Sequence, residues 1–154
     1  MNWIEEKGKE YTELEHFDKN VYGFIYIIKH KKTGRFYIGK KQLLSVVNKK
    51  LGKKELIAIK EDRKVNKVQG KQPTKKRVIS ENGWQDYWGS CKPLLQEIKE
   101  QGKDKFERQI LQLCYNSKQL TYFEVMYQFK YDVLQNNNCY NETILGRYHR
   151  KDFK

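Results

Sequence analysis

The stretch VYGFIYIIKHKKTGRFYIGK, residues 21–40, is the part of the chain that decides the fold. Its two apolar runs, residues 24–28 and 36–39, have the length and the β-branched and aromatic content that are typical of strands. The polar segment between them contains Gly34, which can take a positive φ angle in a turn. The stretch therefore predicts a β-hairpin.

Each strand of this hairpin carries one tyrosine, and the two, Tyr26 and Tyr37, are 11 positions apart. Tyrosine is common in strands, so such a hairpin can be purely structural. The segment resembles the catalytic hairpin of the GIY-YIG nucleases, whose two signature triplets lie on neighbouring strands at about this spacing. The second triplet, residues 37–39, is intact, whereas Phe24 stands at the glycine position of the first triplet and the displaced glycine is Gly23.

Length and composition favour one folded domain, residues 1–154, with an N-terminal arm at 1–20. Hydrophobic residues make up 38% of the chain and aromatic residues 14%, which argues against disorder. No apolar run approaches the roughly 20 residues of a membrane helix, and the N-terminus lacks the pattern of a signal peptide. The three cysteines form no C-x-x-C pair, so neither a zinc site nor a disulfide framework is predicted.

Positive charge is concentrated in one segment. The net charge is +13, and residues 40–77 contain fourteen lysines and arginines but three acids. This is typical of a protein that binds a polyanion, although a solvated lysine-rich loop would show the same pattern. We expect a basic insertion at residues 41–83 that contacts DNA. The predicted DNA-contacting residues are Lys40, Lys41, Lys49, Lys50, Lys53, Lys54, Lys71, Lys75, Lys76 and Arg77.

Inside the insertion, apolar residues at loosely helical spacing predict an amphipathic helix over residues 46–68, interrupted by Gly52. Residues 70–76 (GKQPTKK) follow as a loop, since glycine and proline break regular structure.

The C-terminal half predicts a helix, a strand and a second helix. Ser90 is a candidate N-cap of the first helix, and Gly102 ends it. Residues 106–114 read as a strand. The second helix begins at Ser117 or Thr121, where Thr-x-x-Glu has capping-box spacing, and ends before a turn of three asparagines. With the hairpin, this order predicts an α+β fold: a small three-stranded antiparallel sheet flanked by helices.

The resemblance to the GIY-YIG nucleases extends over residues 22 to about 145 and implies further site residues. Glu124 matches the metal-binding glutamate on a helix downstream of the third strand, and Asn141 matches the asparagine of the tail. Tyr87 begins an aromatic-aromatic-Gly-Ser motif that is similar to one in phage-encoded homing endonucleases of this family. The family arginine that follows the second triplet is missing, and Lys40, Lys41 or Arg77 are candidate replacements.

The chemistry implied by the resemblance is hydrolysis of a phosphodiester bond. One Mg²⁺ or Mn²⁺ ion could stabilise the charge of the pentavalent phosphorus. Glu124 alone would be sufficient to hold it, because such an ion keeps most of its waters and needs few protein ligands. In the family, the first tyrosine is thought to be the general base, and here it is Tyr26. A free tyrosine has a pKa of about 10, so a nearby cation would have to favour the phenolate. Tyr37 would orient water or phosphate.

Each assignment has a structural alternative. Glu124 can be a capping-box residue, Asn141 a turn residue and Tyr37 a core residue. We predict a metal-dependent DNA endonuclease of the bacterial cytoplasm if the chain is phage-encoded, and a homodimer would allow both strands to be cut. The rival readings are a nuclease-derived nucleic-acid-binding protein without catalysis and a basic interaction module. The predicted catalytic residues are Tyr26, Tyr37, Lys40, Arg77, Tyr87, Glu124 and Asn141.

Overall fold

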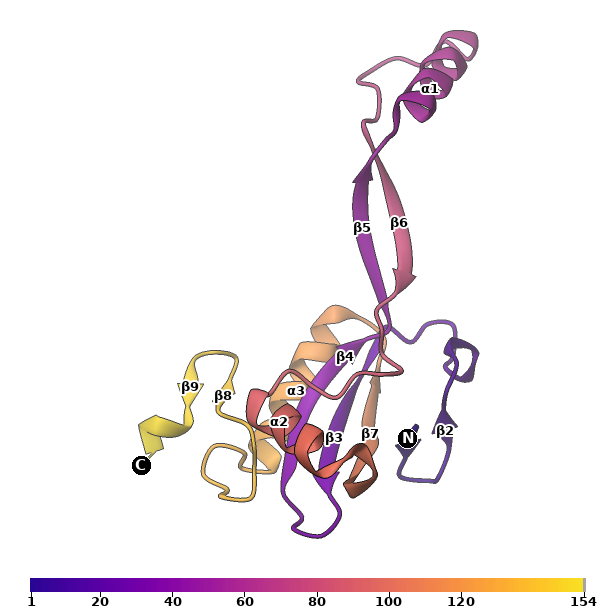
Figure 1. Cartoon of the computed structure of the whole chain (residues 1–154). Helices are drawn as coiled ribbons and strands as arrows, with labels where there is room; N and C mark the ends of the chain where they lie inside the picture. The colour runs from indigo at the N-terminus through magenta and orange to yellow at the C-terminus, as the bar shows by residue number, and fades with distance from the viewer. Residues whose placement is uncertain (154) are drawn as a thin grey trace. The chain divides into compact units, whose positions relative to one another are not determined.

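The computed structural model describes residues 1–153 (Figure 1). The chain divides into two compact units, which we call the sheet unit (Met1–Leu43 and Asn82–Lys154) and the ribbon unit (Leu44–Glu81). The ribbon unit falls within the residues expected to form a basic insertion.

The sheet unit is built on a five-stranded sheet in the order β2-β1-β7-β3-β4. The predicted hairpin is confirmed: β3 and β4 pair antiparallel and place Tyr26 opposite Gly39. The predicted strand 106–114 is β7, which pairs antiparallel with β3. The strand bounds are β1 Trp3–Glu5, β2 Glu10–Tyr11, β3 Gly23–His30, β4 Phe36–Gln42 and β7 Phe106–Cys114.

The α+β class is confirmed, but the sheet is larger than the three strands predicted. The N-terminal arm supplies β1 and β2, and β1 pairs in parallel with β7 through Ile4 and Gln109. This pairing covers an edge of β7 that would otherwise be unpaired. Trp3 fixes the arm, because its side chain is fully buried and its indole N–H donates to the carbonyl oxygen of Trp84 at 2.8 Å.

Two helices complete the layers, α2 (Lys92–Gln101) and α3 (Ser117–Lys130). Helix α2 is capped by Cys91 rather than by Ser90, and it ends as predicted at Gly102, whose φ angle is 93°. Helix α3 begins at Ser117, but its cap is Asn116, whose side chain accepts the backbone N–H of Gln119 at 2.9 Å. Smaller elements are η1 Leu14–His16, η2 Lys103–Lys105, β8 Thr143–Ile144, β9 Tyr148–His149 and η3 Arg150–Phe153.

Alternate residues of β3 divide the core between the two faces of the sheet. Ile25 and Ile27 pack in the cluster that includes Leu120 of α3. On the other face, Phe24 and Tyr26 pack against Trp3. The hairpin is therefore buried on both faces, which explains why residues 24–28 form an unbroken apolar run.

The ribbon unit corrects the predicted helix at 46–68. Residues Leu44–Lys50 form strand β5, which pairs antiparallel with β6 (Lys75–Glu81), and helix α1 spans Lys53–Val65. The consecutive valines of β5 favour a strand when a partner such as Val78 is available. Gly52 ends the strand and caps the helix, and its N–H donates to a carboxylate oxygen of Glu55 at 2.8 Å.

Among residues 1–153, no helix has both the length and the apolar character needed to cross a bilayer.

Candidate active site

Tyr26 and Tyr37 lie on the same face of the β3–β4 hairpin, and their ring centroids are 6.1 Å apart. Tyr26 is buried, with 1% of its surface exposed, whereas Tyr37 is half-buried. Gly39 makes room for both: a Cβ atom there would lie 2.7 Å from Cζ of Tyr26 and 3.0 Å from Cε1 of Tyr37. The glycine of the intact triplet is therefore a steric requirement of the tyrosine pair.

The loop before α2 covers this pair. The ring of Tyr87 stands perpendicular to the ring of Tyr26 at 5.9 Å, and the ammonium of Lys41 lies 4.1 Å from the centre of the Tyr87 ring. Gly89 has a φ angle of 87°, and a Cβ atom there would lie 3.2 Å from the Tyr37 ring. The hydroxyl of Ser90 is 3.4 Å from that of Tyr37. The aromatic-aromatic-Gly-Ser motif thus packs directly on the two tyrosines.

Burial raises the pKa of both tyrosines. The pKa of Tyr26 lies well above 10 because its hydroxyl is desolvated and because Tyr37, Tyr87 and Glu124 lie nearby. Burial also raises the pKa of Tyr37 to about 12. The expectation that a neighbouring cation favours the Tyr26 phenolate is therefore not met in the free protein, since desolvation and the nearby hydroxyls and carboxylate outweigh any cation.

Glu124 projects from the middle of α3 toward β4. Its Oε2 atom forms an ion pair with Lys40 Nζ at 2.9 Å, and the same ammonium donates to Oγ1 of Thr121 at 3.1 Å. The Glu124 side chain is 18% exposed. The capping-box alternative does not hold, because Thr121 lies inside the helix and the cap is Asn116.

Asn141 holds the edge strand in place. Its side-chain oxygen accepts the N–H of Ile38 at 2.9 Å, and its side-chain nitrogen donates to the carbonyl oxygen of Ile38 at 2.8 Å. Gln128 of α3 donates to the same carbonyl at 3.3 Å. Asn141 is buried and is no turn residue: it fixes the residue that lies between Tyr37 and Gly39.

Tyr37, Glu124 and Asn141 meet at a cavity of about 550 Å³ beside β4, whereas Tyr26 and Tyr87 do not line it. Tyr37 reaches it from one face of the sheet, and Lys40 and Glu124 reach it from the other, since β4 is the edge strand. Lys92 and Glu142 also line it and were not predicted. The cavity thus brings together a phenol, ammonium groups and carboxylates around one strand.

The sequence model described as "Putative endonuclease segE, GIY-YIG domain" matches residues 3–144 of this chain. The chain belongs to the GIY-YIG nuclease family. No curated protein and no solved structure matches it. The match covers both units and begins at Trp3, in the N-terminal arm.

The packing of the N-terminal arm explains the degenerate first triplet. Phe24 is fully buried and packs edge-on against Trp3 with ring centroids 5.0 Å apart, so the arm fills the volume above this position with aromatic rings. The displaced glycine is needed as well. A Cβ atom at Gly23 would lie 2.5 Å from the carbonyl oxygen of Lys41 on the neighbouring strand.

GIY-YIG nucleases generally use a divalent metal, and the residues here fit one hydrated ion. Among the described residues there is no group of three or more His, Cys, Asp or Glu that could hold a metal. Mg²⁺ needs few protein ligands because it keeps most of its waters. Glu124 meets this need: it lies in the cavity and already faces a cation, the Lys40 ammonium. The site does not fit a metal such as zinc, which takes three or four protein ligands.

Sequence reasoning missed Arg108, which supports the loop of Tyr87. Its guanidinium lies between the rings of Trp3 and Trp88, 4.5 Å from each. It donates to the carbonyl oxygens of Gln85 at 2.8 Å and Tyr87 at 2.9 Å. Burial lowers the pKa of Arg108 to about 10, so it stays charged at neutral pH. Arg108 has the same place in the alternation of β7 as the buried Phe106 and Ile110, which was an available signal.

The remaining predicted residues belong to the ribbon unit, so they form no part of the described cavity. Arg77 lies opposite Asn48, and Lys76 lies opposite Lys49. Lys76 forms an ion pair with Glu55 of α1. Arg77 therefore belongs to a different unit from Lys40 and Lys41, the other two candidates for the missing family arginine.

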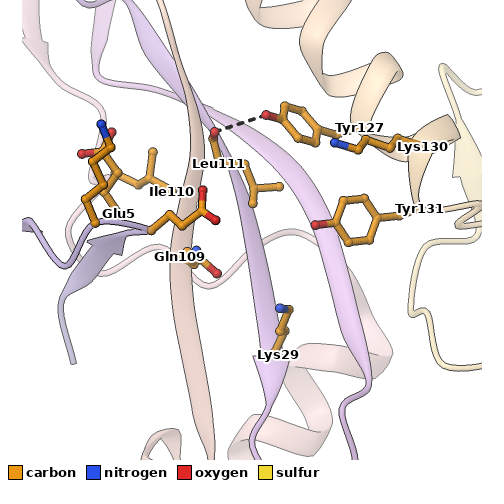
Figure 2. Close-up of a pocket in the computed structure, with 10 residues that line it drawn as sticks. Glu5, Lys29, Gln109, Ile110, Leu111, Tyr127, Lys130 and Tyr131 are labelled. Atoms are coloured by element: carbon orange, nitrogen blue, oxygen red, sulfur yellow. Dashed lines mark hydrogen bonds between the residues drawn. The ribbon is translucent and has the colours of Figure 1, made fainter.

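A second cavity, of about 430 Å³, lies between β7 and the last turns of α3 (Figure 2). Lys29, Glu5 and Lys130 line it, and the hydroxyl of Tyr127 donates to the carbonyl oxygen of Leu111 at 3.3 Å. None of the predicted catalytic residues lines it, so it is a separate feature of the sheet unit.

Proposed function

We propose that this protein is a DNA endonuclease that hydrolyses phosphodiester bonds with a single Mg²⁺ or Mn²⁺ ion held by Glu124. The observation that carries this proposal is the cavity beside β4, where Tyr37, Lys40 and Glu124 face one space. A phosphodiester bound there would meet a carboxylate that can hold a metal ion, a cation for the phosphate oxygens and a phenol.

The chain's own residues have distinct roles in this proposal. When bound at Glu124, a divalent ion supplies positive charge next to the scissile phosphate. Lys40 binds a phosphate oxygen, which gives its ammonium a second anion beside Glu124. Tyr37 orients the attacking water or the phosphate through a hydroxyl that Ser90 holds. Asn141 keeps the backbone between Tyr37 and Gly39 fixed, and so acts as a positioning residue.

Tyr26 is the proposed general base, and because its pKa is raised, the site must favour loss of the Tyr26 proton. A phenol with a pKa well above 10 is neutral at pH 7, so its proton has to be displaced by positive charge that arrives with substrate and metal. Tyr87 interacts with the Tyr26 hydroxyl, and the Lys41 ammonium lies 4.1 Å from the centre of the Tyr87 ring. For the missing family arginine we favour Lys40, with Arg77 as the alternative.

A nucleic-acid-binding protein without catalysis is the second candidate. Two observations favour it: the Glu124 carboxylate is already paired with Lys40, and burial holds the proton on Tyr26. This alternative predicts that the protein binds DNA tightly and leaves it uncut, whether or not a divalent ion is present.

Nicking of supercoiled plasmid separates the two candidates. The wild-type protein should convert the plasmid to the nicked form with Mg²⁺ or Mn²⁺ and not with EDTA. Glu124→Gln should abolish nicking while DNA binding stays nearly intact. Glu107→Gln on β7 is the matched control, because Glu107 is exposed and lies outside the cavity. Nicking by Glu124→Gln at the wild-type rate would refute the metal assignment.

The same assay addresses oligomeric state. One active site cuts one strand, so we propose that a double-strand break requires a homodimer or two encounters. Linear product should then appear after nicked product, and the rate of linear product formation should rise more steeply with protein concentration than the rate of nicking.

A further inference from the structure

The two faces of the β5–β6 ribbon differ. Seven cross-strand pairs define the ribbon, from Leu44 opposite Glu81 to Lys50 opposite Lys75. At the rise of a β-strand, these pairs extend over about 20 Å. Because side chains alternate along a strand, one face carries Ser45, Val47 and Lys49 with their partners. The other carries Val46, Asn48 and Lys50 with theirs, and the pair of Leu44 and Glu81 lies at the end of this second face.

The face of Lys49 is turned toward helix α1. Lys76, the partner of Lys49, forms an ion pair with Glu55 in the first turn of α1. The other oxygen of the same carboxylate caps the helix by accepting the N–H of Gly52. Charge on this face is therefore partly neutralised within the ribbon unit.

The face of Asn48 has no such partner. It presents three cross-strand pairs in a row: Val46 with Ile79, Asn48 with Arg77, and Lys50 with Lys75. All six side chains are exposed, including 46% of Val46 and 57% of Ile79. No carboxylate among residues 1–153 forms an ion pair with its cations. An isolated two-stranded ribbon is only marginally stable in water, so this face is suited to a partner that buries it.

We propose that this face of the ribbon reads base edges in the major groove of duplex DNA, with Arg77 and Asn48 as the base-contacting pair. This rests on the proposed function in taking DNA as the substrate. The major groove is wide enough for a two-stranded ribbon, Arg pairs with guanine and Asn with adenine, and apolar side chains contact the thymine methyl group. Lys50 and Lys75 bind the flanking phosphates.

The occupant is B-form duplex rather than double-stranded RNA. The major groove of an A-form helix is too deep and narrow for side chains to read. A net charge of +8 on Leu44–Glu81, from twelve basic and four acidic residues, complements either polyanion, so the groove shape makes the distinction.

Selection of bound duplexes from a randomised DNA library tests the proposal on the full-length protein in EDTA, where no cutting occurs. The wild-type protein should enrich a motif. Asn48→Ala with Arg77→Ala should lose about 5- to 150-fold of discrimination at the guanine and adenine positions. Ser45→Ala with Ser80→Ala, on the opposite face, is the matched control and should keep the motif.

Arg77→Lys keeps the charge but not the bidentate fork, so it distinguishes a loss of base recognition from a loss of folding or of overall affinity. It should bind random DNA about as well as the wild type and still lose the guanine preference. An unchanged motif in Arg77→Lys, a lost motif in the serine control, a wild-type protein without any motif, or equal competition by RNA duplex would each overturn the proposal. Because the assay needs no cleavage, failure of the nuclease proposal would show instead as an absence of nicking.

Discussion

The sheet unit and the ribbon unit differ in burial and in charge. In the sheet unit, Trp3, Phe24 and Tyr26 are almost completely buried, and the site is held by hydrogen bonds between distant parts of the chain. In the ribbon unit, every residue from 44 to 81 is at least partly exposed. The ribbon unit carries +8 of the net charge of +13. Catalysis needs a rigid site, whereas contact with a polyanion needs surface and charge, and the proposed function places the two in different units.

The largest effect should come from the hydroxyl buried deepest in the sheet unit. Tyr26→Phe keeps the ring and its packing, so the fold should survive. If Tyr26 is the general base, the nicking rate should fall by about 10²- to 10⁴-fold at an unchanged affinity for DNA. Tyr115→Phe, at an exposed tyrosine of the same unit, is the control. A change smaller than about threefold would make Tyr26 a purely structural residue.

The next effect concerns stability, and it contrasts the two units directly. Phe24→Ala removes a fully buried ring from the cluster with Trp3, so unfolding in urea should show a loss of about 3–5 kcal/mol. Val47→Ala in the ribbon unit, at a residue 48% exposed, should cost roughly 0.5 kcal/mol or less. Comparable losses for the two variants would mean that the ribbon unit has a core of its own.

Sequence reasoning identified the elements with strong local signals. The hairpin, the strand 106–114 and the end of α2 at Gly102 all follow from apolar runs and glycine placement. The arm was missed as part of the sheet because its anchoring depends on Trp3 reaching Trp84, 81 positions away. Strand β5 was read as part of the helix that contains α1, because the partner of its valines, β6, lies beyond a loop and out of reach of local patterns.

The candidate site shows the same division. Tyr26, Tyr37, Glu124 and Asn141 were chosen by resemblance to the family, and their catalytic roles stay predictions. Nothing in the sequence indicates that Asn141 clamps Ile38, because the two residues are 103 positions apart. The raised pKa of Tyr26 was also out of reach, since it depends on how deeply the strand is buried.

That raised pKa predicts a pH dependence. A general base must be deprotonated, and below its pKa the phenolate fraction rises tenfold for each pH unit. Because burial keeps the pKa of Tyr26 above 10, the rate of nicking should rise with pH from 7 to 9, by up to about tenfold per unit. Tyr26→Phe should flatten the profile. A wild-type rate that is independent of pH over this range would argue that Tyr26 acts as a neutral hydrogen-bond donor.

The smallest effect should come from substitutions in the ribbon unit, and it should appear only in the affinity for DNA. Each phosphate neutralised contributes about −0.9 to the slope of log K against log salt, so about five contacts give a slope of roughly −5. Replacing Lys75, Lys76 and Arg77 by Gln should flatten the slope by about 2 to 3 units. The value should lie near 2, because Lys75 binds a phosphate and Arg77 brings its charge into the groove, whereas Lys76 is already paired with Glu55 and releases fewer counterions on binding. Between 100 and 200 mM salt, the wild-type protein should then lose about 30-fold in affinity and the variant roughly 8-fold.

The matched control replaces three exposed lysines of the sheet unit, Lys19, Lys32 and Lys99. It removes the same amount of positive charge as the ribbon variant, but from the sheet unit. If charge acts only through the net total, both triple variants will flatten the slope equally. If the ribbon unit carries the contacts, the control will keep the wild-type slope and its nicking rate. An unchanged slope in the ribbon variant would make these residues a solvated surface and place the path of the DNA on the sheet unit.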